Sequence, residues 1–580
     1  MLFQKNVQIL KKIEPYLVAK LKKVKPNKEG PLPYLSQKLD LVIDDDLKFH
    51  DVIVILGFGL GDHIRKVISS SSKSSLILII DHDLSTFKAL LESIDLSDIF
   101  SHQQVSLSFD EDLLLATRGR IEQYFGEVML AETFKIIKNP ISMNLAPDFY
   151  EKVLNQLNEI QYIAYLNLGS ILRSNYISEI NTIKNLPAIV CHPGVGELSN
   201  KFRNVPAIIV SSGPSLSKNV SFIRHAKNKA IIICVDTALK VLQRHQIEPD
   251  FVTSIEFNLK NYLCFKKIKL RNTYLIASEE VAPKTINKFK EKVFFIHSSN
   301  PITKWFSKVI NLKESISLGG NVGATSFSLA INLGANPIIF VGQDLSYSQG
   351  KYYADEIGSS FIEAKKDDAK KRKTVWLESI YGEKVASDSG MLVYLRWFER
   401  EIACHQDRIF INATEGGAKV KGTEPMVLQA VIDAYCQNNL NITDIINETF
   451  KKPNQDIEKV ILSIKTLVEE YQTILIYSSQ GKELIKRHKS NKSKDKSKDI
   501  SRNHQVHLSL SMIVKDIISL PNFMEANKLS IESLLHRLKK GRKSEVLNNY
   551  LLFFKEITKF SRQLLISFEK ILPKLESLIN

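Results

Sequence analysis

Short apolar runs alternate with amphipathic stretches in two parts of the chain. This pattern is typical of a parallel sheet whose two faces are both covered by helices. The first part has apolar runs at 52–56 and 76–80, joined by a glycine turn and a helical stretch. The second part begins near Val205, and its strands are expected at 206–210, 230–236, 249–257, 273–278, 292–297 and 336–342. The fold class is therefore predicted to be α/β, with a Rossmann-like N-terminal unit followed by a central parallel α/β domain.

The remaining segments have the 3.6-residue period of helices. Residues 1 to about 45 read as helical with a Pro/Gly break at PNKEGPLP, and about 130–200 is predicted to be a helical connector. From about Thr423 onward the pattern is helical with few glycines, so an all-α C-terminal domain is expected. Within it, the Lys/Ser-rich stretch 486–504 is predicted to be mobile, because it has little apolar surface to bury. The predicted domains are 1–130, 131–200, 201–424 and 425–580.

The composition is that of a globular protein with more than one domain. The chain has 580 residues, of which 44% are hydrophobic and 24% are charged. No apolar run approaches the roughly 18 residues of a membrane span, and the amphipathic N-terminus does not resemble a signal peptide. We therefore expect a cytoplasmic protein without a membrane span. Its five cysteines lack the spacing of a zinc site, which predicts reduced thiols; they are Cys191, Cys234, Cys264, Cys404 and Cys436.

Positive charge is concentrated near the C-terminus. The net charge of the chain is +16, and residues 451–580 contain 25 Lys+Arg against 14 Asp+Glu, a net charge of +11. Such a surface can attract nucleic acid, anionic lipid or an acidic protein. Because the sequence has no helix-turn-helix, RNA-binding signature or zinc module, no nucleic-acid partner is expected. A solvated lysine surface is the preferred interpretation.

The first glycine turn, in LGFGLGD, follows the apolar run 52–56. Gly61 precedes Asp81 by 20 residues, a spacing that fits a Rossmann-type nucleotide fold. The third glycine of G-x-G-x-x-G is replaced by Asp62. Two interpretations stay open: a nucleotide or dinucleotide site, and a scaffold whose glycines only make the turn, which we prefer. The triplet Asp81-His82-Asp83 is a weak metal signal, and no metal is expected.

A second turn, VSSGPSLSKN at Val210–Asn219, leaves a buried strand through small and hydroxylated residues. Glycine permits a tight backbone path and proline fixes φ, while the helix that follows offers free N–H groups to an anion. Ligands of parallel sheets bind at the carboxyl ends of the strands. The polar residues expected at these ends are Ser211, Asp236, Glu256, His297, Gln343 and Asp344.

A third informative stretch runs from Ser317 to Glu356. A glycine turn at 319–323 leads into a helix whose first residues are small, so a ligand can approach its N-terminus closely. The helix ends at Gly334, a good C-cap. After the next strand comes a polar loop with Tyr347, Tyr352 and Tyr353, whose hydroxyls either donate to a phosphate or pack on the core.

Taken in order, six motifs resemble the motility accessory factor (Maf) flagellin glycosyltransferases: VSSGPSLSKN, CVDTALK, EPDFVTSIE, GGNVGATSFSLA, FVGQDLSYSQGKYYA and INATEGGAKVKGT. The resemblance covers about 200–425, and the outer regions fit the layout of that family. It implies transfer of a nonulosonic acid, pseudaminic or legionaminic, from its CMP-activated form to Ser/Thr of flagellin, in support of flagellum assembly and motility. The central domain is also similar to bacterial CMP-sialic-acid sialyltransferases, which implies catalysis without metal or other cofactor.

The resemblance also implies roles for individual residues. CMP would lie among Ser211, Ser212, Gly213, Pro214 and Ser215, and further nucleotide or sugar contacts would come from Asp236, Thr237, Glu256, Asn321, Gly323, Thr325 and Gln343. The departing phosphate would be held by Tyr347 and by Tyr352 or Tyr353. The sialyltransferases use a loop histidine as the general base, but none lies between His297 and His405 here. Asp344 and Glu415 are the preferred catalytic carboxylates, and Glu378, Asp388 and His405 stay open as alternatives.

Two other functions stay open. The same domain type resembles archaeal pterin diphosphokinases, which would bind ATP at the Val210–Asn219 turn. A flagellin-binding chaperone with a degenerate site is the third possibility. The helical region 425–580 favours a protein acceptor such as flagellin over the pterin diphosphokinase, because that enzyme needs no long helical region. The intact polar residues at the strand ends weigh against a chaperone with a degenerate site. The sequence leaves the particular nonulosonic acid, the acceptor sites and the oligomeric state undetermined.

Overall fold

A computed structural model of the chain describes residues 2–27, 29, 47, 52–71, 75–102, 104–109, 134–297, 301–310, 315–347, 351, 353–354, 374–490, 496–527, 531, 534–535, 538 and 546–579. Contacts divide the chain into two units, Met1–Arg173 and Ser174–Asn580. The four-part division expected from the sequence is a finer one and stays a prediction.

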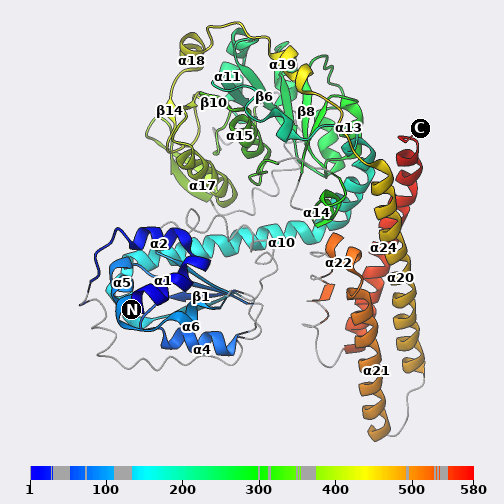
Figure 1. The fold of residues 1–580 in the computed structure, drawn as a ribbon. Helices are drawn as coiled ribbons and strands as arrows, with labels where there is room; N and C mark the ends of the chain where they lie inside the picture. Colours follow the sequence, from blue (N-terminus) through cyan, green and yellow to red (C-terminus); the bar gives the residue numbers. More distant parts are fainter. Residues whose placement is uncertain are drawn as a thin grey trace. The chain divides into compact units, whose positions relative to one another are not determined.

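The first unit is a parallel sheet covered by helices (Figure 1). Its described strands are β1 (Val52–Leu56), β2 (Leu76–Ile80), β3 (Val105–Ser108) and β4 (Phe134–Lys138), in the order β3-β2-β1-β4. The helices include α1 (Leu2–Ile13), α2 (Pro15–Leu21), α4 (Asp62–Ser70), α5 (Leu84–Ser93), α6 (Ser97–Phe100) and α9 (Pro140–Leu145). All strand pairs are parallel. The predicted Rossmann-like unit is confirmed.

Strand β4 corrects one part of the sequence analysis. Residues 134–138, FKIIK, were expected to begin a helical connector, yet they pair in register with β1 from Val52↔Phe134 to Leu56↔Lys138. The run has only two aliphatic residues between lysines, so its own pattern is too short to distinguish strand from helix. The helix that the sequence predicts in this region begins later, as α10 (Pro147–Ile189), which crosses the boundary between the two units.

The second unit is built around a larger parallel sheet, which has eight strands among the described residues in the order β14-β13-β10-β5-β6-β7-β8-β9. The strands are β5 (Ala207–Val210), β6 (Ile231–Val235), β7 (Phe251–Ser254), β8 (Tyr274–Ser278), β9 (Val293–Ile296), β10 (Ile338–Val341), β13 (Phe410–Asn412) and β14 (Glu424–Pro425). The six strands from β5 to β10 confirm the predicted runs. The short strands β13 and β14 were not predicted.

Alternating residues of these strands enter two different hydrophobic cores. Ile208 and Val210 of β5 pack in one core, while Ala207 and Ile209 pack in the other. Both faces of the sheet are therefore covered, which explains why the strands read as continuous apolar runs. Helix α15 (Val322–Leu333) and helix α17 (Ser389–Cys404) contribute to the second core. The short hairpin of β11 (Thr374–Glu378) and β12 (Lys384–Asp388) precedes α17.

The chain changes direction at β5. From β5 it adds β6, β7, β8 and β9 on one side, and it then returns to place β10, β13 and β14 on the other side. In parallel sheets, the crevice outside the carboxyl ends of the strands at such a reversal is where ligands bind. The reversal therefore places the candidate site at the carboxyl ends of β5 and β10.

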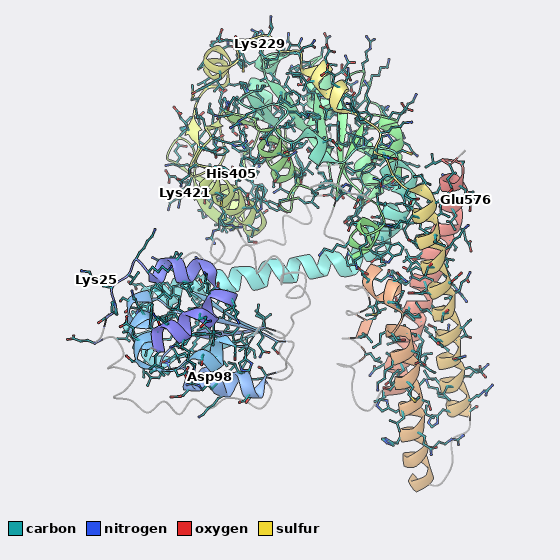
Figure 2. The ribbon with its side chains drawn as sticks, in the orientation of Figure 1. Lys25, Asp98, Lys229, His405, Lys421 and Glu576 are labelled. Atoms are coloured by element: carbon teal, nitrogen blue, oxygen red, sulfur yellow. The ribbon has the colours of Figure 1, made fainter. Side chains whose placement is uncertain are left out.

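The C-terminal region is helical, as predicted (Figure 1). Its described helices are α18 (Leu428–Tyr435), α19 (Ile442–Thr449), α20 (Ile457–Ser490), α21 (Lys496–Ile518), α22 (Pro521–Ala526) and α24 (Val546–Glu576). Helices α20 and α24 are antiparallel, since Lys465 pairs with Glu576 (3.1 Å) and Lys482 donates to Thr558 (3.0 Å); Glu576 is labelled in Figure 2. The side chains of these helices join the same hydrophobic core as one face of the central sheet.

One further expectation concerns a segment of this region. The Lys/Ser-rich stretch 486–504 was predicted to be mobile, and this stays a prediction. Residues 486–490 belong to α20 and 496–504 to α21, and 491–495 lie outside the described residues. Lysine has a high helix propensity, which explains why these residues can extend the two helices.

Within the described part of the chain, no helix combines the length and hydropathy needed to cross a membrane. All five cysteines are free thiols.

Candidate active site

The turns that follow β5 and β10 are bound to each other at the centre of the larger sheet. The hydroxyl of Ser211 donates to Oε1 of Gln343 (2.5 Å), and the amide of Gly213 donates to the carbonyl of Gly342 (2.8 Å). A Cβ at Gly342, which has φ +68°, would lie 2.4 Å from the carbonyl oxygen of Ser211, so only glycine allows this approach. The structure thus brings together two turns that the sequence separates by more than 120 residues.

The buried carboxylate of Asp344 lies at the start of the short helix α11 (Leu216–Asn219). It accepts hydrogen bonds from the amide of Ser215 (3.3 Å to each oxygen) and from the hydroxyl of Ser215 (2.6 Å). A Cβ at Gly213 would lie 2.1 Å from Asp344 Oδ2, so the turn closes around the carboxylate only because residue 213 has no side chain. The sequence predicted that this helix start binds the anion of a ligand. In the structure, the protein's own carboxylate takes that place.

The carboxyl end of β6 is connected to the same turn. The hydroxyl of Thr237 donates to that of Ser212 (2.8 Å). Asp236 is 1% exposed and accepts from the amide of Thr237 (2.7 Å), the hydroxyl of Ser254 (3.0 Å) and the side-chain amide of Asn261 (2.7 Å). Burial raises the pKa of Asp236 to about 6. Both predicted residues are therefore neighbours of the turn, and Asp236 connects the ends of β6 and β7.

Helix α15 begins beside these contacts and has an unused donor. Asn321 is its N-cap, and its Oδ1 accepts the amide of the third helical residue (2.9 Å). Its Nδ2 is buried and has no partner among the described residues. A Cβ at Gly323 would lie 2.8 Å from Gln343 Oε1 and 3.5 Å from Ser211 Oγ, which places the first turn of α15 against the two joined turns. Thr325 is fully buried, and its hydroxyl donates to the backbone of the preceding loop (2.7 Å).

The tyrosine loop after β10 reaches the same area. The hydroxyl of Tyr347 donates to the carboxylate of Asp388, the N-cap of α17, at 2.6 Å. Tyr353 packs against the core, and the amide of the residue after it donates to the carbonyl of Ser212 (3.0 Å). The loop therefore contacts the nucleotide turn predicted from the sequence. Tyr352 lies outside the described residues.

Two non-glycine residues at this end of the sheet have left-handed backbone conformations. Leu345, which follows β10, has φ +50°, and Glu415, which follows β13, has φ +57°. Strained conformations of this kind cluster at functional sites. Glu415 Oε1 accepts from the side-chain amide of Asn219 (3.2 Å) and from the amide of Leu428 at the start of α18 (3.2 Å). In the described ranges, its other carboxylate oxygen accepts no hydrogen bond. Lys218 donates to the backbone carbonyl of Glu415 (3.2 Å).

The other candidates from the sequence lie apart from this group or are engaged elsewhere. Glu378 is exposed on the hairpin and forms an ion pair with a lysine (2.8 Å). His405 follows the end of α17 and bonds to the carbonyl of Glu401 (2.8 Å; Figure 2). His297, at the end of β9, pairs with Glu279 (2.7 Å) four strands from β5. Across the described residues, no group of three or more His, Cys, Asp or Glu side chains could hold a metal ion.

Comparisons with known proteins fit this architecture. Residues 180–350 match the family model of 6-hydroxymethylpterin diphosphokinase MptE-like proteins. The solved structure of a Maf glycosyltransferase from Magnetospirillum magneticum AMB-1 aligns over 100% of this chain and 99% of its own, with a TM-score of 0.56 and 15% sequence identity. The chain has the fold of a Maf glycosyltransferase. The fold that the resemblance to the Maf family implies is thereby confirmed. No curated protein sequence matches the chain.

The sequence analysis did not identify three residues that form contacts at the site. Lys218 lies in the quoted turn VSSGPSLSKN, so a lysine beside a proposed anion site was the available signal. Asn261, which donates to Asp236, and Thr414, whose hydroxyl accepts the amide of Gln343 (3.3 Å), have no distinguishing pattern around them. Their importance follows only from the folded arrangement of β7, β10 and β13.

Proposed function

We propose that this chain is a glycosyltransferase that moves a nonulosonic acid, pseudaminic or legionaminic, from its CMP-activated form to Ser/Thr of flagellin. The unpartnered, buried Nδ2 of Asn321 at the start of α15 carries the proposal, because it is a donor placed where a ligand anion is expected. The start of α11 already holds the carboxylate of Asp344. The anionic part of the donor sugar nucleotide is therefore assigned to α15 and not to α11.

The remaining polar groups are assigned to the nucleoside. The hydroxyls of Ser211 and Ser212 and the side chain of Thr237 lie between α15 and β6. These groups are short and uncharged, so they suit the hydroxyls of a ribose and the edge of a pyrimidine. Lys218 adds a cation at the β13 side of the turn. This assignment is supported by the resemblance of the motifs to CMP-sialic-acid sialyltransferases.

In the proposed reaction, the bond between the anomeric carbon and the phosphate oxygen of CMP breaks, and positive charge develops on the sugar. The bonding electrons leave with the phosphate oxygen, whose negative charge is stabilised by hydrogen-bond donors fixed in advance. The N-terminus of α15 and Asn321 are the donors that we assign to this role. Tyr347 would join them when its hydroxyl turns from Asp388 to the departing phosphate. The acceptor hydroxyl attacks the anomeric carbon and transfers its proton to a general base.

Glu415 is our choice for the general base. Both oxygens of Asp344 accept hydrogen bonds from Ser215, and the two oxygens of Asp388 accept from Tyr347 and Met391. Glu415 retains one carboxylate oxygen without a hydrogen bond from any described residue, in a strained backbone at the carboxyl end of β13. Asp344 is better explained as a positioning residue for the turn.

The C-terminal helices are proposed to bind the protein acceptor. Several large apolar side chains on α20 and α24 are exposed, including Ile476 (58%) and Ile566 (49%). An amphipathic helix can pack its apolar face on such residues, and the excess of positive charge in 451–580 would increase the encounter rate with an acidic partner. No cofactor or metal is required by this proposal.

A pterin diphosphokinase activity is the alternative favoured by the family model that matches 180–350. The two functions are distinguished by titrating the purified protein with CMP, CDP and ATP in a calorimeter, and by measuring hydrolysis of a CMP-nonulosonic acid. Our proposal expects CMP to bind with an affinity at least about tenfold above that of ATP, a difference of about 1.4 kcal/mol, and to be released from the sugar donor. Preferential ATP binding together with diphosphate transfer to a pterin would replace our proposal with the alternative.

A further inference from the structure

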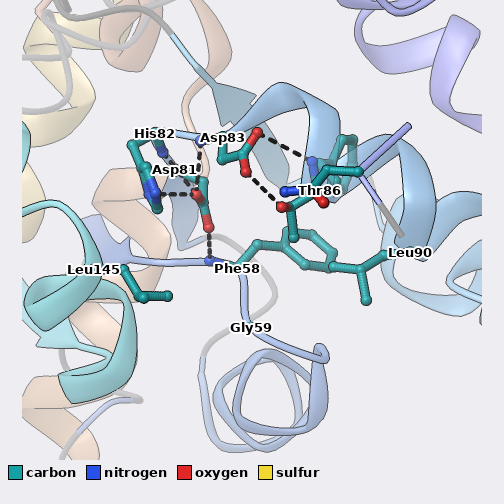
Figure 3. A pocket seen from close by; sticks show the side chains of 10 residues that line it. Phe58, Gly59, Asp81, His82, Asp83, Thr86, Leu90 and Leu145 are labelled. Carbon is teal, nitrogen blue, oxygen red and sulfur yellow. Dashed lines mark hydrogen bonds and ion pairs between the residues drawn. The ribbon is translucent and has the colours of Figure 1, made fainter. Parts of the chain in front are cut away.

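A cavity lies in the first unit, at the carboxyl ends of β1 and β2 (Figure 3). Its volume is about 180 Å³. Phe58 and Gly59 line it from the turn after β1, Asp81–Asp83 from the turn after β2, and Leu145 from the end of α9. In the order β3-β2-β1-β4, the chain reverses its direction of strand addition at β1. The cavity therefore borders the end of the strand at which this sheet reverses, where a ligand is expected.

The glycine turn beside this cavity is only partly explained by packing. Gly57 and Gly61 have φ values of +95° and +93°, and a Cβ at these positions would lie 2.1 Å from Ser142 Oγ and 2.9 Å from Ile99 Cδ1. Contacts inside the unit thus require both glycines. Gly59 also has a positive φ, of +54°, but it borders the cavity. A scaffold role accounts for the first two glycines, and access to the cavity accounts for the third.

The walls of the cavity have one apolar and one polar side. Phe58, Phe87 and Leu90 are almost fully buried around it, and Leu145 is 47% exposed at its edge. A planar base would be held by such a surface. On the polar side, Asp81 Oδ1 accepts the amides of the two residues that follow it, whereas Oδ2 accepts only the amide of Phe58 (2.6 Å) among the described residues. Because each carboxylate oxygen has about two acceptor sites, Oδ2 can take another hydroxyl donor.

The charges around the cavity disfavour phosphate. Asp62 occupies the first turn of α4, at the position of the third glycine in the dinucleotide-binding pattern, and its side chain is 80% exposed. Asp81 and Asp83 add two more carboxylates, against His82, which lies 3.1 Å from Asp81, and Arg65, which pairs with Asp62 (3.3 Å) and is shared with Asp98 (2.6 Å). A pyrophosphate at the start of α4 would meet like charge where known dinucleotide sites have a glycine.

We propose that this cavity binds a ribonucleoside whose 5′ substituent is uncharged or cationic. The ribose hydroxyls donate to Asp81 Oδ2, and the base packs against Phe58 and Leu145. The cavity is smaller than the about 300–1,000 Å³ that is usual for drug-sized ligands, which fits one nucleoside better than a dinucleotide. The proposal concerns a different sheet from the candidate active site and is independent of the function proposed above.

Calorimetry on the full-length protein tests this inference with four probes: adenosine, S-adenosylmethionine, ADP and NAD. We expect the first two to bind at least about tenfold more tightly than the last two, an effect of the size that nearby like charges produce. Asp62→Gly should reduce this preference, because it removes the carboxylate and restores the third glycine. Tighter binding of ADP or NAD to the wild-type protein, or no binding of either nucleoside probe at millimolar concentration, would overturn the proposal.

Variants at the cavity assign the signal to the first unit. Gly59→Asn tolerates the left-handed backbone and fills part of the cavity, and Leu145→Asp places a charge at its exposed edge. Both should weaken adenosine binding at least about tenfold, whereas the matched variant Leu145→Met keeps an apolar edge and should bind as the wild type does. Circular dichroism confirms that each variant is folded. If folded Gly59→Asn and Leu145→Asp proteins bind adenosine normally, the nucleoside binds elsewhere and the inference is wrong.

Discussion

Replacing Gly213 with alanine is the perturbation whose effect the structure defines most closely. The new methyl group would lie 2.1 Å from Asp344 Oδ2 and 2.6 Å from the carbonyl oxygen of Gly342. Neither atom is the far end of a flexible side chain that could move away, since Asp344 is 2% exposed and bonded to Ser215. The turn that follows β5 must therefore shift away from β10.

The shift has two energetic consequences. Overpacking of a close-packed site costs about 1–3 kcal/mol, and weakening the charged hydrogen bond between Ser215 and Asp344 costs about 1.5–3 kcal/mol. The second unit should therefore lose roughly 2.5–6 kcal/mol of unfolding free energy. Because Ser211 and Ser212 move with the turn, CMP affinity should also fall, and a displacement near 1 Å can lower turnover by about 100-fold.

The assay combines urea unfolding, CMP calorimetry and donor turnover, all measured on protein shown to be folded. Gly416→Ala is the matched control, because its Cβ would meet Ser215 Cβ at 3.4 Å, an ordinary contact, in the same part of the site. Ser215→Ala gives a milder test, since it removes only the 2.6 Å hydroxyl contact with Asp344. A folded Gly213→Ala protein with wild-type stability and CMP affinity would refute this account of the turn.

Four further predictions concern other residues. The pKa of Asp236 in the folded protein, about 6, exceeds its unfolded value of 3.8, so the folded state binds the proton more tightly and this residue's contribution to stability falls as pH rises from about 4 to about 6. The free energy of unfolding in urea should therefore decline less across this pH range in Asp236→Asn than in the wild type. Equal declines in the two proteins would contradict the assignment. Tyr347→Phe should lower turnover by roughly 10²–10³ with little change in CMP affinity, and full turnover would show that the tyrosine only packs. Glu415→Gln should lower turnover by about 10²–10⁴ while CMP still binds; an unchanged rate would remove it as the base. Exchanging Ile476 and Ile566 for glutamate should reduce transfer to flagellin about tenfold or more without slowing hydrolysis of the donor, and equal transfer would refute acceptor binding at these helices.

The central sheet could be predicted because its strands are buried on both faces. Runs such as 206–210 and 337–341 are apolar at every position, as strands buried on both faces are expected to be. Strands β13 and β14 were missed because they have three and two residues, and the second ends in Pro425 at the edge of the sheet. Strand β4 was missed because FKIIK acquires its identity from pairing with β1 and not from its own sequence.

The position of the candidate site was also predictable, but its chemistry was only partly so. Strand-end residues such as Ser211 and Gln343 converge because parallel strands end at one edge of the sheet. The role of Asp344 was not visible, since it depends on a contact with Ser215 across 129 residues. The same holds for Asn321, whose unpartnered amide becomes apparent only when every hydrogen bond of the first turn of α15 is assigned.

The most direct test of the central claim is the intact mass of flagellin produced together with a CMP-nonulosonic acid pathway and this protein. We expect the flagellin mass to increase by whole numbers of nonulosonic acid residues with the wild-type protein. The increase should be absent without the protein and strongly reduced with the Gly213→Ala variant. An unchanged flagellin mass in the presence of the folded wild-type protein and its donor would contradict the proposed glycosyltransferase function.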